Sequence, residues 1–152
     1  MITDFASYID YFRQMAASHV DLVDFVHGNS ERILQRNRSN ISYPLLWLET
    51  PDITPRDAGG LIHDYRGTIL VLTNAQAGDW DKEDEELGKM LTIVNDLVQK
   101  MYDDADAGTL RTFRMDGGIE HKGRWGTDND WGWRFSFTIS VQVDCLDEAK
   151  FQ

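Results

Sequence analysis

The chain is poor in cysteine and in basic residues, and each shortage excludes a class of protein. Its single cysteine, Cys145, cannot form an internal disulfide, which fits a reducing cytoplasm. Lysine and arginine total 15 against 26 aspartates and glutamates, so the formal net charge is -11. Such a chain repels the phosphates of nucleic acids and of anionic lipid surfaces. We therefore expect neither nucleic acid nor a membrane as a partner.

Long apolar runs are also missing. No stretch approaches the roughly 18 apolar residues of a membrane-spanning helix. Residues 1–18 carry acidic and aromatic side chains where a secretory signal has a basic start and an aliphatic core. We expect a cytoplasmic protein that folds as a single domain over residues 1–152, since its 41% hydrophobic content is ample for one core.

The familiar motifs for metal binding and catalysis are missing too. The histidines never pair at a zinc-binding spacing, and Cys145 has no cysteine partner. The acidic runs that begin at Asp79, Asp104 and Asp128 lack the sixth-position glycine and twelfth-position carboxylate of a calcium loop. No GxSxG, GxGxxG or GxxxxGK[ST] occurs. We expect no metal, no cofactor and no catalytic residue. An enzyme of unrecognised type therefore ranks third, behind the two non-enzymatic functions given at the end of this section.

The most regular stretch that is present is DWGWRFSFTISVQV, residues 130–143. From Trp131 to Val143 every odd position is apolar and every even position is glycine or polar. Because side chains alternate across a strand, this pattern predicts one long strand with an apolar face and a polar face. We expect helices against the apolar face, and water or another subunit against the polar face.

Two amphipathic helices are predicted, over residues 4–17 and 82–104. In each, apolar residues recur three to four positions apart. Thr3 or Asp4 can cap the first helix and Asp81 the second. The later carboxylates Asp103, Asp104 and Asp106 suit the exit from the second helix rather than its body, because they oppose the helix dipole.

Strands are predicted at residues 22–28, at 45–48 between Pro44 and Pro51, at 61–73 with a break or bulge at Gly67, and at 110–121. Residues 50–60 and 122–130 are predicted as loops, and residues 30–40 as a helical turn or a surface loop. The order of elements shows no regular strand and helix alternation. It indicates an α+β domain with a mostly antiparallel sheet of about four to five strands and both helices on one face.

Two further features have open alternatives. The basic run at residues 30–40, with Arg32, Arg36 and Arg38, is either a solvated face or a docking patch for an acidic neighbour. The tryptophans Trp125, Trp131 and Trp133 fit core packing at the end of the sheet, a platform for stacking a sugar or peptide, or a subunit contact.

The chain resembles a known family in the order of its elements. The pieces that carry the resemblance are the strand opened by YP in ISYPLLWLETP and the DNDWGW start of the last strand, residues 128–133. In these the chain is similar to the small tail terminator and tail completion proteins of phages and prophage-like elements, and to proteins of Bacteroidetes-type genomes. The resemblance implies a non-enzymatic structural protein that forms a ring, stops tail-tube growth and meets the head connector in a virion or tail-like particle.

We therefore expect a homo-oligomer, weak in isolation, whose other partners are virion or tail-like particle proteins. A small-molecule or peptide-binding module is the alternative. Unlike surfaces on one subunit can associate head to tail. The candidate interface residues are Arg32, Arg36, Arg38, Lys122, Arg124, Trp125 and Arg134.

Overall fold

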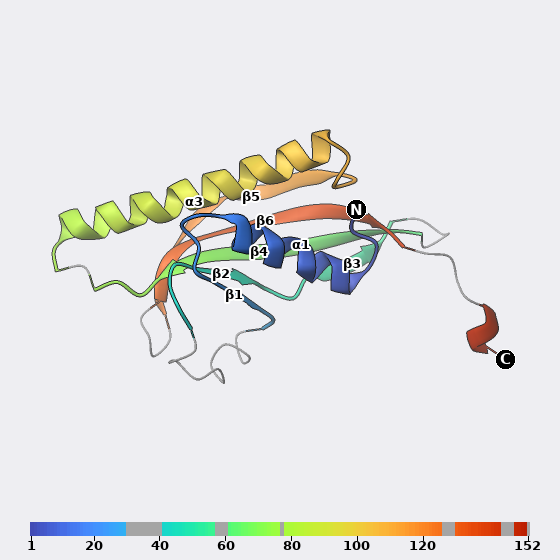
Figure 1. The fold of residues 1–152 in the computed structure, drawn as a ribbon, viewed down its shortest axis with the longest axis horizontal. Helices are drawn as coiled ribbons and strands as arrows, with labels where there is room; N and C mark the ends of the chain where they lie inside the picture. The colour runs from blue at the N-terminus through green and yellow to red at the C-terminus, as the bar shows by residue number, and fades with distance from the viewer. Residues whose placement is uncertain (30–40, 57–60, 77, 126–129, 144–147, 152) are drawn as a thin grey trace.

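The computed structural model describes residues 1–29, 41–56, 61–76, 78–125, 130–143 and 148–151. The chain forms an α+β domain, as predicted (Figure 1). Its helices are α1 (Phe5–Ser18), α3 (Trp80–Asp106) and the short 3-10 helix η2 (Glu148–Phe151). Its strands are β1 (Asp24–His27), β2 (Leu45–Leu48), β3 (Asp52–Pro55), β4 (Ile62–Thr73), β5 (Phe113–Trp125) and β6 (Asp130–Gln142).

The strands form one mostly antiparallel sheet in the order β1-β2-β4-β6-β5, with β3 also paired to β4. Only the β1–β2 pair is parallel among the described strands. The expected count of four to five strands is wrong, because the described part of the chain already forms a sheet of six. The missed strand, β3, lies in the segment predicted as a loop. All four of its residues are exposed, so they show no apolar alternation, and β3 is held by backbone pairing to β4.

Both main helices lie on one face of the sheet. The apolar stripe of α1 and that of α3 share one core with the odd positions of β6, including Phe135, Phe137 and Ile139. In Figure 1 α3 runs along β5 and β6, with α1 beside it. The alternation in residues 130–143 therefore predicted the buried face of β6 correctly.

The boundaries of α1 agree with the prediction, whereas α3 begins earlier and ends later than predicted. Asp4 caps α1 by accepting from the Ser7 amide at 2.8 Å, as expected. Asp79, not Asp81, caps α3, which also continues past Asp104 to Asp106. The prediction that the late carboxylates belong to the exit is wrong. Asp104 is buried, and its carboxylate accepts from the Tyr11 hydroxyl at 2.7 Å and from Lys100 Nζ at 2.5 Å. These charge-assisted hydrogen bonds offset the cost of burying a carboxylate near the C-terminal end of α3.

The predicted bulge at Gly67 is also wrong. Pairing between β4 and β6 runs without a break from Ile62–Gln142 to Thr73–Trp131. Gly67 instead makes room for the core, because a Cβ there would lie 2.3 Å from the Tyr8 hydroxyl oxygen and 2.6 Å from the Phe137 ring. Irregular pairing occurs in β5, between Asp116 and Glu120, beside Gly117 at φ +84°.

Candidate functional site

The strongest candidate site is the sheet face opposite the helices, which we call the open sheet face. It consists of the even positions of β6 and of the side chains paired with them on β4 and β5. Its polar members are Asp64, Arg66, Thr68, Arg114, Asp116, Glu120, Lys122, Arg134, Ser136, Thr138, Ser140 and Gln142. These side chains form hydrogen bonds and ion pairs across three strands, so the face has a fixed arrangement.

One part of this arrangement joins β4 to β6. Arg56, just after β3, donates from Nη2 to Asp64 Oδ1 at 2.6 Å and from Nε to Oδ2 at 3.3 Å. Asp64 also accepts from the Ser140 hydroxyl at 3.0 Å, and Thr112 donates to the same Ser140 oxygen at 2.7 Å. The hydrogen bond from Arg56 is the largest of the effects that lower the pKa of the Asp64 carboxyl. Asp64 is therefore an ionised anchor that orients Arg56 at neutral pH.

A second part centres on Asp116 of β5. Its carboxylate accepts from Arg114 Nε at 3.1 Å and from the Thr138 hydroxyl, and lies 3.9 Å from Arg66 Nε. Only 14% of the Asp116 side chain is exposed, against 68% for Arg66 and 73% for Arg114. The carboxylate thus lies beneath two guanidinium groups that face solvent. Both arginines interact with Asp116, Arg114 also interacts electrostatically with Asp64, and guanidinium donors that face solvent remain available to a further carboxylate.

Farther along β6 the charges are balanced. Arg134 lies 3.9 Å from Glu120, and the hydroxyls of Thr68 and Ser136 hydrogen-bond at 2.9 Å. We call Arg56, Arg66 and Arg114 the arginine patch. Because its guanidinium groups are outermost, a partner that approaches this part of the open sheet face meets positive charge first.

The other half of the same face is apolar and buried. There β2 and the end of β4 carry a second, smaller core of Val26, Ile41, Leu45, Trp47, Leu70 and Leu72, with Tyr43 packed against it. Trp47 donates from its indole nitrogen to the Gly28 carbonyl at 2.8 Å, and the Tyr43 hydroxyl donates to Asp130 at 2.8 Å. The arginine patch therefore lies on the part of the face away from this second core, whereas Arg134 lies beside the second core, opposite Leu70.

The surface of α3 has the opposite charge. The helix contains nine aspartates and glutamates and three lysines. Its first residues extend the imbalance: residues 79–85, which we call the helix tip, carry five carboxylates and one lysine. Trp80 in the helix tip is 86% exposed. The helix tip is thus an acidic surface with a large aromatic side chain at its centre.

The structure separates the interface residues that the sequence predicted. Lys122 and Arg134 share the open sheet face, where they occupy neighbouring paired positions. Arg124 does not join them, because its guanidinium lies over the Trp131 ring, 5.6 Å from the ring centre. Trp125 ends β5 opposite Asp130. Arg32, Arg36 and Arg38 lie outside the described residues.

Two of the three clustered tryptophans have structural roles. Trp131 is buried and donates from its indole nitrogen to the Ala75 carbonyl at 3.1 Å. Trp133 donates to the Leu87 carbonyl of α3 at 2.9 Å and packs against the main core. Core packing is therefore the alternative that the structure supports for these two residues.

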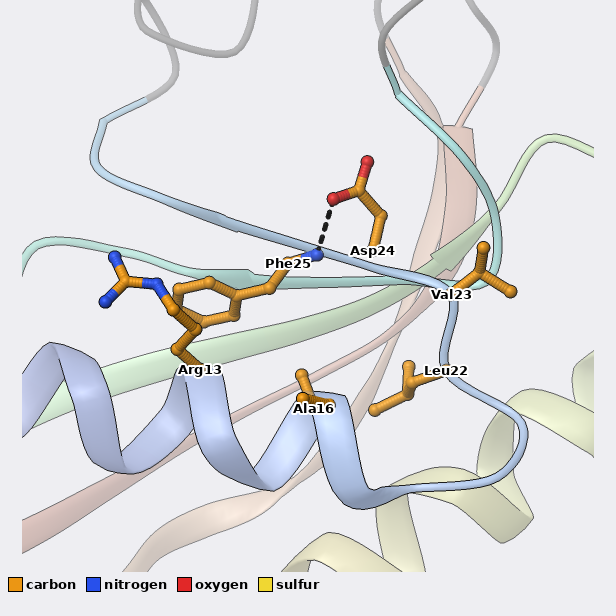
Figure 2. Close-up of a pocket in the computed structure, with 7 residues that line it drawn as sticks. Arg13, Ala16, Leu22, Val23, Asp24 and Phe25 are labelled. Carbon is orange, nitrogen blue, oxygen red and sulfur yellow. Dashed lines mark hydrogen bonds between the residues drawn. The ribbon is translucent and has the colours of Figure 1, made fainter.

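A shallow cavity of about 350 Å³ lies between α1 and β1. Figure 2 shows Ala16, Leu22 and Phe25 facing this cavity, while Asp24 points away from α1. Arg13 closes one side, with its guanidinium 5.6 Å from the centre of the Phe25 ring. The lining combines apolar side chains with the charged Arg13 and Asp24, so the cavity suits a small group of mixed polar and apolar character.

The sequence analysis did not single out three residues of these candidate surfaces, Arg66, Arg114 and Trp80. Arg66 follows a usable signal, because Asp64, Arg66 and Thr68 are polar at alternate positions of a strand. Arg114 follows a similar signal, because Thr112, Arg114 and Asp116 alternate with the apolar Phe113 and Met115 before the irregular pairing of β5 begins. Trp80 belongs to the first turn of α3, which the sequence placed two residues later.

Comparison with known proteins, and a search for metal sites and membrane-spanning helices, give little information about the class of this protein. No known family model matches the chain, and no curated protein matches it either. Among the described residues, no three histidine, cysteine, aspartate or glutamate side chains gather closely enough to hold a metal ion. None of the described helices has the length and apolar character required to cross a membrane.

Proposed function

We propose that this protein is a non-enzymatic assembly protein whose copies join head to tail in a ring, in the manner of phage tail terminator and head–tail joining proteins. The open sheet face is the observation that carries the proposal. It presents the exposed Arg66 and Arg114 around Asp116 on a chain whose formal net charge is -11.

The hydrogen-bonded side chains of the open sheet face favour contact with a protein partner over contact with solvent alone. Side chains that are already held by hydrogen bonds lose little conformational freedom when a partner binds. Arg56 and Arg114 are held in this way by Asp64 and Asp116. Arginine is also enriched in protein interfaces, and a polar interface of this kind gives specificity with modest affinity. Modest affinity suits subunits that must assemble only on a finished tube.

The distribution of charge favours a contact between unlike surfaces. The arginine patch lies on one face of the sheet, whereas the acidic α3 lies on the other. A contact between two different surfaces of one protein is heterologous, and it produces a closed ring when the rotation between copies closes. A two-fold dimer made through either surface alone would instead bring like charges together.

A binding module for a small molecule or peptide is the second candidate. The cavity between α1 and β1 is the specific observation in its favour, because apolar side chains line it together with the charged Arg13 and Asp24. Its shallowness makes it the weaker proposal, since ligand pockets of similar volume enclose most of their ligand.

Sedimentation velocity tests the first proposal. The wild-type protein, whose monomer mass is 17.5 kDa, is measured from micromolar to millimolar concentration at low and moderate salt. We expect the average mass to rise with concentration and to fall when salt is added, because salt screens the contact between unlike charges. A protein that stays monomeric at millimolar concentration and low salt contradicts the assembly proposal and favours the binding module.

A further inference from the structure

We propose that the arginine patch of one copy binds the helix tip of the next copy. This inference rests on the proposed assembly function and identifies its two contact surfaces. Arg66 and Arg114 would bind the carboxylates of Asp81 and Asp84, and Trp80 would pack against the sheet beside them.

The arginine patch has the chemistry for this contact. Arg66 and Arg114 share Asp116, and both side chains are more than two-thirds exposed. Arg66 approaches Asp116 only at 3.9 Å, which is an ion pair without a short hydrogen bond. Two further carboxylates lie near the patch: Asp52, paired with Arg66 across β3 and β4, and Asp64, which binds Arg56 and interacts electrostatically with Arg114. An incoming carboxylate can therefore gain charge-assisted hydrogen bonds from guanidinium donors that face solvent.

The helix tip has the complementary chemistry. Asp81 and Asp84 are exposed, whereas Asp79 caps the helix and Glu85 and Glu86 lie near Lys89. Asp84 follows Trp80 by one helical turn, so both side chains lie on the same side of α3. Tryptophan and arginine are the residues most enriched among those that dominate binding energy at interfaces. An exposed tryptophan flanked by carboxylates is thus suited to a partner rich in arginine.

The two surfaces cannot meet within one molecule. The segment from Thr73 to Asp79 is short, so α3 begins at the end of β4 where Thr73 pairs with Trp131. Arg66 is seven residues back along β4, about 23 Å away, and on the opposite face. Figure 1 shows α3 starting at one end of the molecule, with β3 and the start of β4 toward the other end. Because the two surfaces lie at opposite ends of one molecule, a contact between them joins two copies head to tail.

Charge reversal in two variants tests this contact by sedimentation at low salt. Arg66→Glu with Arg114→Glu makes the patch acidic, and Asp81→Lys with Asp84→Lys makes the helix tip basic. We expect each double variant alone to associate at least about tenfold more weakly than wild type, because like charges then face each other. We expect an equimolar mixture of the two to recover association, because every contact in an alternating assembly again joins opposite charges.

Two further variants keep the test independent of folding. Asp103→Lys with Asp106→Lys makes the same charge change at the other end of α3, and it should leave association at least as strong as in wild type. Trp80→Ala should weaken association without changing the melting temperature, since the side chain is 86% exposed. Recovery in the mixture shows that both charge-reversal variants are folded.

The outcomes separate the two proposals. Wild-type association that neither charge reversal weakens overturns this contact and leaves the assembly function in place, with its interface elsewhere. Weakening by each variant without recovery in the mixture also overturns it, since the two surfaces then do not contact each other. A wild-type protein that never associates overturns both proposals.

Discussion

The hydroxyl oxygen of Tyr8 lies 2.3 Å from the point that a Cβ atom on Gly67 would occupy. Tyr8 is fully buried on α1, and Gly67 lies in the unbroken pairing of β4 with β6. The helix can therefore lie this close to the central strand only because residue 67 has no side chain. This contact fixes α1 against the sheet whose other face carries the arginine patch.

Gly67→Ala should destabilise the protein. The added methyl group would meet the Tyr8 hydroxyl and the Phe137 ring, and overpacking of this kind costs about 1–3 kcal/mol. For a chain of this size each kcal/mol lowers the melting temperature by about 2–4 °C. Gly118→Ala is the matched control, because no atom lies within 4 Å of the position of its Cβ. Equal melting temperatures for the two variants would show that the contact between α1 and β4 is wrong.

Phe137→Ala and Ser136→Ala, adjacent on β6, should differ sharply in stability. Phe137 is fully buried in the main core, so its loss should cost about 3–5 kcal/mol. Ser136, on the open sheet face, loses one hydrogen bond to Thr68, worth about 0.5–1.5 kcal/mol. Urea unfolding measures both. Similar losses would mean that β6 is buried on two sides at this position.

Tyr11→Phe should change both the stability and its dependence on high pH. Burial, and then the hydrogen bond to Asp104, raise the pKa of Tyr11 above its ordinary value. Wild-type stability should therefore be complete below about pH 10 and fall as the pH rises above it, because the fold disfavours the phenolate.

The variant should unfold about 1.5–3 kcal/mol more easily at pH 7, since Asp104 loses a donor. Its loss of stability above pH 10 should be shallower than that of wild type, although Tyr8, whose pKa burial also raises, still contributes. Urea unfolding at neutral and alkaline pH provides the comparison. An unchanged alkaline slope would show that Tyr11 does not titrate as the geometry requires.

Arg56→Gln should raise the pKa of Asp64 toward its ordinary value. The lowered pKa in the folded protein means that Asp64 contributes stability above about pH 4, and that this contribution is lost as the pH falls through the folded pKa. In the variant that acid-induced loss should be smaller. A carboxyl titration followed by NMR measures the pKa directly. Arg13→Gln, which removes an arginine paired with Asp10, should leave the pKa of Asp64 unchanged. A shift of the Asp64 pKa in this control would indicate a general effect of net charge.

Local patterns in the sequence predicted the features that depend on alternation or helical periodicity. The period of two in residues 130–143 identified the buried face of β6, and the apolar stripes placed α1 and α3 within two residues at each end. Features that depend on contacts between distant segments were missed. Gly67 reads as a strand breaker in isolation, and only the position of Tyr8, 59 residues earlier in the chain, explains it.

In the candidate site, too, local patterns were predicted and contacts between distant segments were missed. The polar face of β6 was expected, but the union of Arg66 and Arg114 over Asp116 depends on the order β4-β6-β5, which no local pattern encodes. Asp104 was misplaced for a related reason, because its partner Tyr11 lies 93 residues away. Arg124 carried the same charge as its neighbours in sequence, yet its contact with Trp131 takes it off the open sheet face.

The central claim is that copies of this chain join head to tail in a closed ring. Native mass spectrometry of the wild-type protein at low ionic strength and high concentration tests it most directly, because a closed ring has one fixed number of subunits. We expect one dominant assembly of three or more 17.5-kDa subunits, in equilibrium with monomer. Monomer alone, or a dimer as the largest species at every concentration, would contradict the account.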